Sequence, residues 1–155
     1  MIRVQKEDFD VGDEINRLSL GKSGIGGIVS FVGLVRDFKG EDRKTGEAVS
    51  AMTLEHYPAM TAREIERVEA EARQRWRLED CLVIHRYGRL VAGDRIVLVV
   101  TAAAHRGDAF AACEFLIDWL KTKAPFWKQE ETPSGTDWVE ARAADDDRAA
   151  RWAKD

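Results

Sequence analysis

The sequence predicts an α+β fold in which two main helices cover a mixed or antiparallel sheet. Two segments, 61–76 and 109–123, carry apolar residues at helical spacing. Seven shorter segments are rich in β-branched and aromatic residues and are bounded by glycine or polar turns. Along the chain these strands mostly come in pairs between helices, an order typical of α+β domains.

The composition of the chain narrows its class. Its 155 residues are 45% hydrophobic, enough for one sizeable core. We expect one domain over 1–142 and a charged tail over 143–155. A formal net charge of −4 argues against a general nucleic-acid binder. The sequence has no apolar run of membrane-span length and no signal-peptide pattern, and its 2 cysteines do not suggest a disulfide framework. We therefore expect a cytoplasmic protein with neither a nucleic-acid nor a membrane partner.

The N-terminal segment predicts a strand, a helix and a turn. Residues 2–5 alternate in hydrophobicity and predict a short edge strand, and 8–20 predict a short helix. The glycine-rich stretch 21–27 superficially resembles a phosphate-binding loop. Asn16 stands where that motif requires its first glycine, and a strand follows instead of a helix, so we interpret the stretch as a flexible turn. The buried residues expected in the helix are Ile15, Leu18 and Leu20.

Two strands separated by a polar loop are predicted next. GIVSFVGLVR (27–36) is β-branched and aromatic and predicts a central strand ending in Arg36. The following residues, 37–47, are polar and contain glycine, so they predict an exposed, mobile loop. Residues 48–57 predict a strand that pairs with the previous one as a long-looped hairpin and ends at Pro58.

The first main helix is predicted over 61–76. Thr61 followed by Glu64 matches a capping box at the helix start. The remaining face is rich in charged residues and should be solvated. The apolar stripe consists of Ile65, Val68, Ala72 and Trp76.

Two further strands and the second main helix follow. Residues 81–87 and 94–103 predict strands separated by a turn at 88–93. The strand 94–103 is nearly all apolar and should be central and covered on both faces. A helix is expected from about 109 to 123. Its apolar face comprises Phe110, Cys113, Leu116, Ile117 and Leu120.

A proline marks the end of the second main helix. Pro125 lacks an N–H group and disfavours helical backbone at its predecessor, so the helix should end by about Ala124. Two short strands, 125–131 and 137–141, should flank a turn. The last residues, 144–155, are charged and predict a frayed helix.

Lysines on either side of Pro125 form the first candidate site. Lys121 falls in the last helical turn and Lys128 in the following strand, with Phe126 and Trp127 between them. Two ammonium groups on different elements can converge on one pocket. The alternative is that Lys121 only complements the helix dipole and Lys128 is solvated.

A second candidate site precedes the same helix. His105 and Arg106 stand where the helix dipole and free backbone N–H groups favour an anion, and their side chains add positive charge and donors. This pattern predicts a phosphate site; the alternative is two exposed loop residues. Arg36, beside the 37–47 loop, is able to join such a pocket.

The spacing of the two candidate sites has a geometric consequence. Arg106 and Lys121 are separated by fifteen mostly helical residues, or about 20 Å along the axis. One chain therefore cannot easily bring both to one small substrate. If both act on one molecule, the site should lie across a dimer interface.

Other site classes have little support in the sequence. His56, His85 and His105 lie on separate segments without metal-ligand spacing, so no metal site is expected. His85 is interpreted as a structural strand residue. Cys113 belongs to an apolar helix stripe, and Cys81 begins a strand. No Ser-His-Asp or nucleophile-elbow pattern is present, and no cofactor is expected.

Six sequence blocks, in order along the chain, carry a family resemblance. They are FVGLVRD (31–37), LEHYPAMT (54–61), VIHRYGRLVAGD (83–94), AHRGDAF (104–110), LKTKAPFWKQE (120–130) and DWVEA (137–141). Each block alone is a weak signal, but together, with the pattern K-x-x-A-P-F-W-K, they are specific. Over about residues 27–142 the chain resembles the large, catalytic subunit of molybdopterin synthase.

The resemblance implies a fold, a reaction and partners. The implied fold is an α/β hammerhead with a small additional β subdomain. The implied reaction transfers sulfur to cyclic pyranopterin monophosphate and forms the molybdopterin dithiolene. The sulfur donor would be the C-terminal Gly-Gly thiocarboxylate of a small ubiquitin-like subunit. The family assembly is a heterotetramer around a dimer of large subunits, which agrees with the cross-dimer geometry.

The resemblance also implies roles for individual residues. Lys121 and Lys128 match the two active-site lysines of the family, with Lys121 expected at the thiocarboxylate carbon and Lys128 at the pterin. The chain departs from the family pattern at Leu34, where relatives often carry lysine, and at Gln129, where a basic residue is common. The expected substrate-binding residues are Arg36, His105, Arg106, Gln129 and Glu130.

Two other functions fit parts of the sequence. A non-catalytic dimeric scaffold could dock a ubiquitin-like tail without transferring sulfur, although tail docking alone needs no second lysine. A persulfide sulfurtransferase could instead use Cys81 or Cys113.

Overall fold

The computed structural model describes residues 1–140 and 142–154. Ala141, the last residue of the strand predicted over 137–141, and Asp155, at the end of the predicted tail, lie outside the described residues. The helices are α1 (Val11–Ser19), α2 (Pro58–Arg75), α3 (Arg106–Thr122) and α4 (Ala143–Ala150), followed by a 3₁₀ turn (Arg151–Lys154). The strands are β1 (Ile2–Gln5), β2 (Gly27–Leu34), β3 (Ala51–His56), β4 (Leu78–Arg86), β5 (Gly88–Val91), β6 (Arg95–Ala103), β7 (Phe126–Thr132) and β8 (Gly135–Val139).

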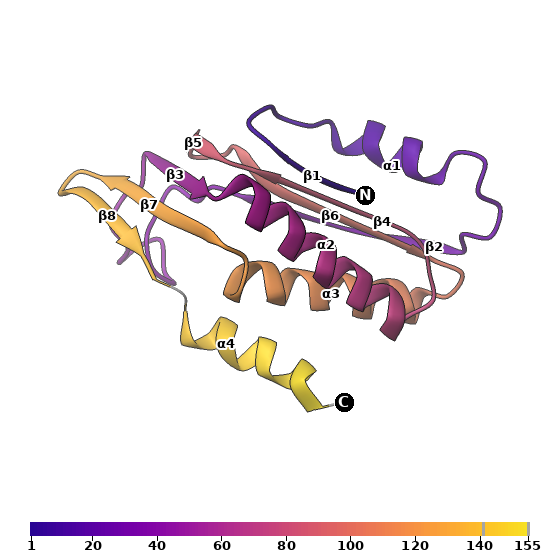
Figure 1. The fold of residues 1–155 in the computed structure, drawn as a ribbon. Coiled ribbons are helices and arrows are strands. Elements are labelled where there is room, and N and C mark those ends of the chain that lie inside the picture. The colour runs from indigo at the N-terminus through magenta and orange to yellow at the C-terminus, as the bar shows by residue number, and fades with distance from the viewer. Residues whose placement is uncertain (141, 155) are drawn as a thin grey trace.

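The larger sheet has the strand order β1-β4-β6-β2. β1 runs parallel to β4, whereas the β4–β6 and β6–β2 pairs are antiparallel. Figure 1 shows α2 and α3 side by side on one face of this sheet and α1 on the other. The predicted α+β class, with a mixed sheet and two main helices, is confirmed.

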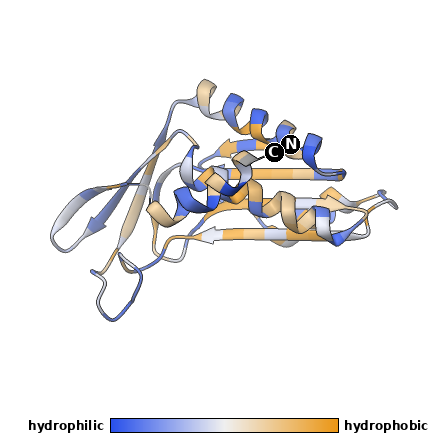
Figure 2. Ribbon diagram, turned by 90° about the horizontal axis from the view of Figure 1, so that it is seen from below, coloured by the Kyte–Doolittle hydropathy of each residue, from blue (hydrophilic) through white to orange (hydrophobic). Residues whose placement is uncertain are grey.

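The side chains of the larger sheet alternate between its two faces, so the core has two layers. Along β4 and β6, Val83 and Val99 pack in the cluster under α2 and α3, whereas Ile84 and Leu98 pack in the cluster under α1. Successive side chains of a strand point to opposite faces, so a continuous apolar run fills both layers. The prediction that 94–103 forms a central, doubly covered strand is therefore confirmed. The strands of this sheet are coloured mostly as hydrophobic in Figure 2.

A second, smaller sheet provides the additional β subdomain. Its order is β5-β3-β7-β8, and all of its neighbouring strands are antiparallel. Three buried residues, Val35, Leu54 and Leu90, form the apolar cluster at its inner face. The partly buried Ile96 belongs to the peripheries of both this cluster and the one under α2 and α3, so it joins the two sheets.

The predicted pairing of 27–36 with 48–57 is wrong. β2 pairs with β6 at the edge of the larger sheet, and β3 pairs with β5 and β7 in the smaller one. The exposed loop between them carries the chain from one sheet to the other instead of closing a hairpin. β2 is thus an edge strand, not a central one, and it ends at Leu34. The 88–93 segment, predicted as a turn, contains strand β5.

The predicted start of the first main helix is also wrong. α2 begins at Pro58, and no side chain caps it. Proline suits the first helical turn because the N–H it lacks has no partner there. Thr61 is fully buried, and its hydroxyl donates to the carbonyl of Pro125 at 3.3 Å. The Thr61 hydroxyl, which the capping-box pattern assigned to the helix start, therefore forms a tertiary hydrogen bond instead.

Two predicted core residues are exposed. Phe110 of α3 is 62% exposed and Leu20, after α1, is 81% exposed. The buried face of α3 uses Phe115 and Trp119 instead, which pack in the cluster shared with α2. α3 also begins at Arg106, three residues before the predicted start.

The C-terminal segment packs against α3. The buried carboxylate of Asp118 accepts hydrogen bonds from Arg151 and from the indole N–H of Trp152, both at 2.8 Å. The Trp152 ring stands edge-on to Trp76 and Phe115 with centroids 5.6 Å away in each case. Among residues 1–140 and 142–154, no helix is long and apolar enough to cross a membrane.

Candidate active site

A cavity of about 450 Å³ lies where the two sheets and the C-terminal segment meet. The end of α3, strand β7, the end of β2 and the residues after β8 line it. It brings together Arg36, Lys121, Lys128 and Glu130, four of the residues predicted for the site. Its other lining residues are Leu34, Met52, Ile96, Leu120, Thr122, Ala124, Phe126, Val139, Glu140, Arg142 and Asp145.

The connection between the two lysines is held in place by packing. α3 ends at Thr122, as the proline predicts, and Phe126 begins β7. The Phe126 ring stacks on His85 with centroids 3.8 Å apart and on His56 at 5.8 Å. Together with the Thr61 hydrogen bond to Pro125, these contacts fix the direction in which β7 leaves the helix.

Lys128 is the lysine whose proton affinity is most perturbed. Burial lowers its pKa, and the neighbouring charge of Lys121 lowers it further. Asp145 and Glu130 act in the opposite direction. Lys121 itself is exposed at the cavity rim. The cavity therefore combines an accessible ammonium group with a partly buried amine that releases its proton more readily than free lysine.

Glu130 supplies an acceptor without a donor. The side chain is only 8% exposed, and its Oε2 atom accepts no hydrogen bond from any described residue. The alternation of β7 places Lys128 and Glu130 on the cavity side. Gln129 falls on the opposite face, in register with Thr53 and Trp138, and its side chain does not line the cavity.

Two arginines share one backbone acceptor at the cavity wall. The carbonyl of Gly40 accepts from Arg36 at 3.0 Å and from Arg142 at 3.3 Å. Arg36 also lies over the ring of Phe38, 4.8 Å from its centroid. Sequence reasoning missed Arg142 because it lies between the last predicted strand, which ends at 141, and the charged helix predicted from 144, and it belongs to none of the six sequence blocks. No local sequence pattern singled it out: β8 ends at Val139, and Arg142 lines the cavity from the segment that follows the strand.

The predicted anion-binding pair lies at the far end of α3. His105 is the N-cap of this helix and Arg106 its first residue, and both are exposed. The rise of an α-helix places Arg106 about 22 Å from Lys121 along the axis. Neither residue of the pair lines the lysine cavity. The geometric prediction that one chain does not bring both groups together is confirmed.

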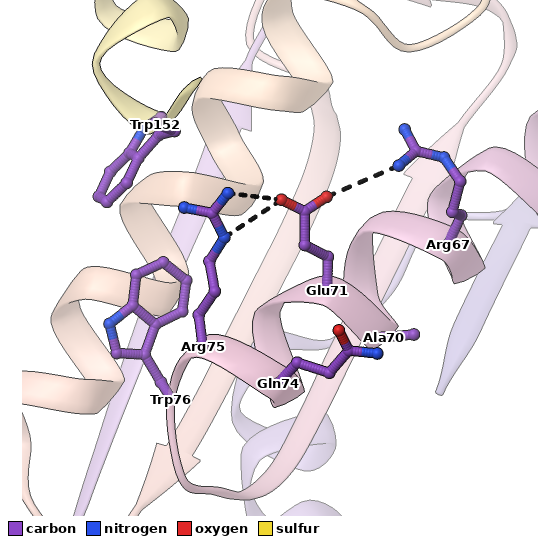
Figure 3. A pocket seen from close by; sticks show the side chains of 7 residues that line it. All are labelled: Arg67, Ala70, Glu71, Gln74, Arg75, Trp76 and Trp152. Atoms are coloured by element: carbon purple, nitrogen blue, oxygen red, sulfur yellow. Dashed lines mark hydrogen bonds and ion pairs between the residues drawn. The ribbon is translucent and has the colours of Figure 1, made fainter. Parts of the chain in front are cut away.

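A larger cavity, of about 820 Å³, lies beside α2, and none of the residues predicted for the functional site lines it. Figure 3 shows that its charged side chains are already paired with one another. Glu71 accepts two hydrogen bonds from Arg75, at 2.8 and 3.1 Å, and lies 3.6 Å from Arg67. The cavity beside α2 therefore has fewer unpaired charged groups for binding a ligand than the lysine cavity has.

The remaining reactive side chains do not build a site. Burial raises the pKa of Cys81 to about 12 and that of Cys113 to about 11, so both thiols stay protonated at neutral pH. Burial lowers the pKa of His85 to about 3, which keeps the stacked ring neutral. The described part of the chain contains no group of three His, Cys, Asp or Glu residues that could hold a metal ion.

Comparisons with known proteins give a consistent result. The family model described as MoaE protein matches residues 4–123. The chain is 52% identical to the molybdopterin synthase catalytic subunit of Ralstonia nicotianae, covering 97% of this chain and 83% of the relative. It is also 52% identical to the subunit of the same name from Cereibacter sphaeroides, with 97% and 99% covered. The structure of a molybdopterin biosynthesis MoaE protein from Burkholderia ambifaria superposes with a TM-score of 0.82 at 49% identity, covering 100% of this chain and 99% of that one.

Proposed function

The chain belongs to the MoaE protein family of molybdopterin synthase catalytic subunits, and on this premise we propose the reaction that its cavity performs. The enzyme is a sulfurtransferase of molybdenum-cofactor biosynthesis. We propose that it moves two sulfur atoms, each from the C-terminal thiocarboxylate of a small ubiquitin-like subunit, to cyclic pyranopterin monophosphate and forms the dithiolene. Each thiocarboxylate exchanges its sulfur for oxygen and ends as a carboxylate. The observation that carries this proposal is the placement of Lys121 and Lys128 in one cavity.

Each lysine suits one part of this chemistry. An acyl group derived from the thiocarboxylate develops negative charge on oxygen when its carbon becomes tetrahedral. The accessible ammonium of Lys121 would stabilise that oxyanion. Burial and the charge of Lys121 lower the pKa of Lys128. Lys128 would therefore exchange a proton with the pterin during sulfur addition.

The substrate would be held by charge and by hydrogen bonds. Arg36, together with His105 and Arg106 from a second copy of the chain, would bind the cyclic phosphate. The unpartnered oxygen of Glu130 would accept a hydrogen bond from a pterin N–H group. Gln129, whose side chain points away from the cavity, would contribute through its backbone only.

The proposal includes two protein partners. The relatives' name, molybdopterin synthase catalytic subunit, supports a second kind of subunit, and we propose that it is the small ubiquitin-like sulfur donor. The distance between Arg106 and Lys121 supports a dimer of large subunits at the centre of a heterotetramer. The cytoplasm stays the predicted location.

Subunit complementation tests the shared site. We expect Arg106→Ala and Lys121→Ala homodimers to be inactive, because each lacks one half of every site. A mixed dimer of the two variants has one intact site, so random mixing should restore about a quarter of the wild-type turnover, the statistical fraction of intact sites. Mixtures that stay as inactive as the separate variants would contradict the shared site.

A further inference from the structure

We infer that this protein binds a phosphate group in a small pocket between the end of α3, the second half of α2 and the C-terminal segment. The pocket has a volume of about 160 Å³, and we call it the Trp119 pocket. None of the residues assigned to sulfur transfer lines it, so the inference does not depend on the proposed function. The lining residues that matter here are Arg67, Glu71, Arg75, Trp119, Lys123 and Trp152.

The indole N–H group of Trp119 is a buried donor without an acceptor. The side chain is only 7% exposed, and its Nε1 atom donates to no described residue. Buried donors are nearly always hydrogen-bonded, because losing water without gaining a partner is unfavourable. Since Trp119 lines the pocket, an acceptor bound there would satisfy this donor.

Lys123 adds an ammonium group on the same side of the helix end. It is the C-cap of α3, has helical backbone angles and follows Trp119 by four residues. Side chains at this spacing are neighbours on a helix surface. In the described part of the chain, the ion pairs within the pocket join Arg67 and Arg75 to Glu71, and none includes Lys123. An indole donor and an ammonium group side by side favour an anion.

Positive charge exceeds negative charge around the pocket. Arg67, Arg75 and Lys123 are cationic, and Glu71 is the anionic residue that lines it with them. Glu64, outside the pocket, also pairs with Arg67 at 3.1 Å, and an excess of positive charge remains when Glu64 is counted. Arg75 donates its Nε and Nη2 groups to Glu71, which leaves its other guanidinium nitrogen to donate elsewhere. The pocket therefore suits an anion with several acceptor oxygens.

The volume of the pocket selects a compact anion. A water molecule takes about 30 Å³ in the liquid, so the pocket holds about five waters, roughly as many heavy atoms as a phosphate ion has. Drug-sized ligands occupy cavities of about 300 Å³ or more. Phosphate carries more negative charge than a carboxylate and presents oxygens in several directions, which matches donors that come from both α2 and α3.

Two sources of the phosphate group fit the surroundings. Arg67, Glu71, Arg75 and Trp152 line both the Trp119 pocket and the cavity beside α2, so the two spaces are continuous. Figure 3 shows these shared residues from the side of the larger cavity. Inorganic phosphate would occupy the pocket alone. A phosphomonoester would place its phosphoryl group in the pocket and the rest of the molecule in the larger cavity, beside Trp76.

The pocket and the lysine cavity are built from the same two elements. Lys121 of α3 and Asp145 of the C-terminal segment line the lysine cavity, whereas Trp119 and Trp152 of the same elements line the pocket. Phosphate bound between these elements should stabilise the docking of the C-terminal segment. Hydrogen exchange over 149–153 should therefore slow when phosphate is added. Unchanged exchange at saturating phosphate would contradict this placement of the site.

Titration with inorganic phosphate tests the site directly. In protein labelled at the indole nitrogen, each of the 5 tryptophans gives one N–H signal, and Trp119→Phe identifies the signal of Trp119 by its loss. We expect this signal to shift saturably with phosphate. Trp127 and Trp138, which are exposed and outside the pocket, should keep their positions. A Trp119 signal that stays in place, or follows sodium chloride equally at the same ionic strength, would overturn the inference.

A charge-removing variant distinguishes a built site from general attraction of anions. Lys123→Gln should weaken phosphate binding about tenfold, because it removes a charged hydrogen-bond donor. Lys44→Gln removes the same charge from the exposed 37–47 loop and is the matched control, for which the affinity should not change. Thermal unfolding checks that both variants are folded. Equal phosphate affinity in wild type and folded Lys123→Gln would overturn the inference.

Two further titrations identify the source of the phosphate group. Adenosine monophosphate that binds more tightly than inorganic phosphate, and also shifts the Trp76 signal, would support a phosphomonoester. Equal or weaker binding would support the free ion. Sodium acetate that binds as tightly as phosphate would contradict the phosphate assignment and indicate a carboxylate site.

Discussion

Lys121 and Lys128 line one cavity although a helix end and a proline separate them. Burial lowers the pKa of Lys128, and the nearby positive charge of Lys121 lowers it further. The packing of Phe126 against His85 and His56 holds the strand that carries Lys128. The charge of Lys121 therefore favours the neutral form of Lys128.

Removing the charge of Lys121 should raise the pKa of Lys128. A like charge disfavours the ammonium form, so in Lys121→Gln the Lys128 proton should be retained to higher pH. Competitive labelling with acetic anhydride across pH, with mass spectrometry of the Lys128 peptide, measures this shift. Lys123→Gln, beyond the helix end and outside the cavity, is the matched control and should leave the labelling curve in place. An unchanged curve for Lys121→Gln would show that the amines do not interact.

The cysteines should be dispensable for turnover. Both thiols are buried and protonated at neutral pH, and neither lines the lysine cavity. We expect the Cys81→Ala, Cys113→Ala double variant to keep turnover near the wild-type value, with stability reduced by about 1 kcal/mol per site for the lost packing. Turnover assays at a temperature well below the unfolding midpoint separate the two effects. Loss of turnover in a folded double variant would favour a persulfide mechanism.

Thr61 should stabilise the protein through Pro125 and not through a helix cap. Thr61→Val keeps the shape and removes the buried hydroxyl donor, which should cost about 1–2 kcal/mol of unfolding free energy. Glu64→Ala removes only an exposed pair with Arg67 and should cost less than about 0.5 kcal/mol. Urea unfolding of both variants decides between the two roles. Equal losses would restore the capping-box interpretation.

The C-terminal segment should be anchored by Asp118. Trp152→Phe keeps the aromatic packing but removes a donor to a buried carboxylate, at a cost of about 1–3 kcal/mol. Trp138→Phe is the control, because Trp138 is 57% exposed. In an Asp118→Asn background the Trp152→Phe loss should shrink, since the buried acceptor is no longer charged. Additive losses in the double variant would mean that the two residues do not interact.

Local patterns predicted the elements better than their pairing. The apolar run of β6 identified a doubly covered strand, and Pro125 located the end of α3 to within two residues. The hairpin between β2 and β3 was predicted wrongly because strand pairing depends on long-range contacts that adjacent sequence does not encode. β5 was missed because Gly88 and Gly93 signal turns. Both adopt positive φ, but Gly88 is the first residue of the four-residue strand and Gly93 lies after its end.

Local sequence motifs likewise predicted only part of the candidate site, because some of its residues are brought there by long-range contacts. Lys121, Lys128, Arg36 and Glu130 were named from motifs, and the fold brings them to one cavity. Arg142 and Asp145 were not predicted for the site. They line the cavity because the C-terminal segment is anchored to α3 by the hydrogen bond from Trp152 to Asp118. The exposure of Phe110 was also unforeseen: its helical period matches the core stripe, and only the position of α2 shows that this side of α3 is free.

We propose that the lysine cavity transfers sulfur to the pterin. The most direct measurement is single-turnover conversion of cyclic pyranopterin monophosphate by this protein and a thiocarboxylated small subunit, with wild type compared to Lys121→Ala. We predict dithiolene product from wild type and near-complete loss in the variant, with binding of the small subunit retained in both. Wild-type protein that binds the small subunit but forms no dithiolene would contradict the account and indicate a non-catalytic scaffold.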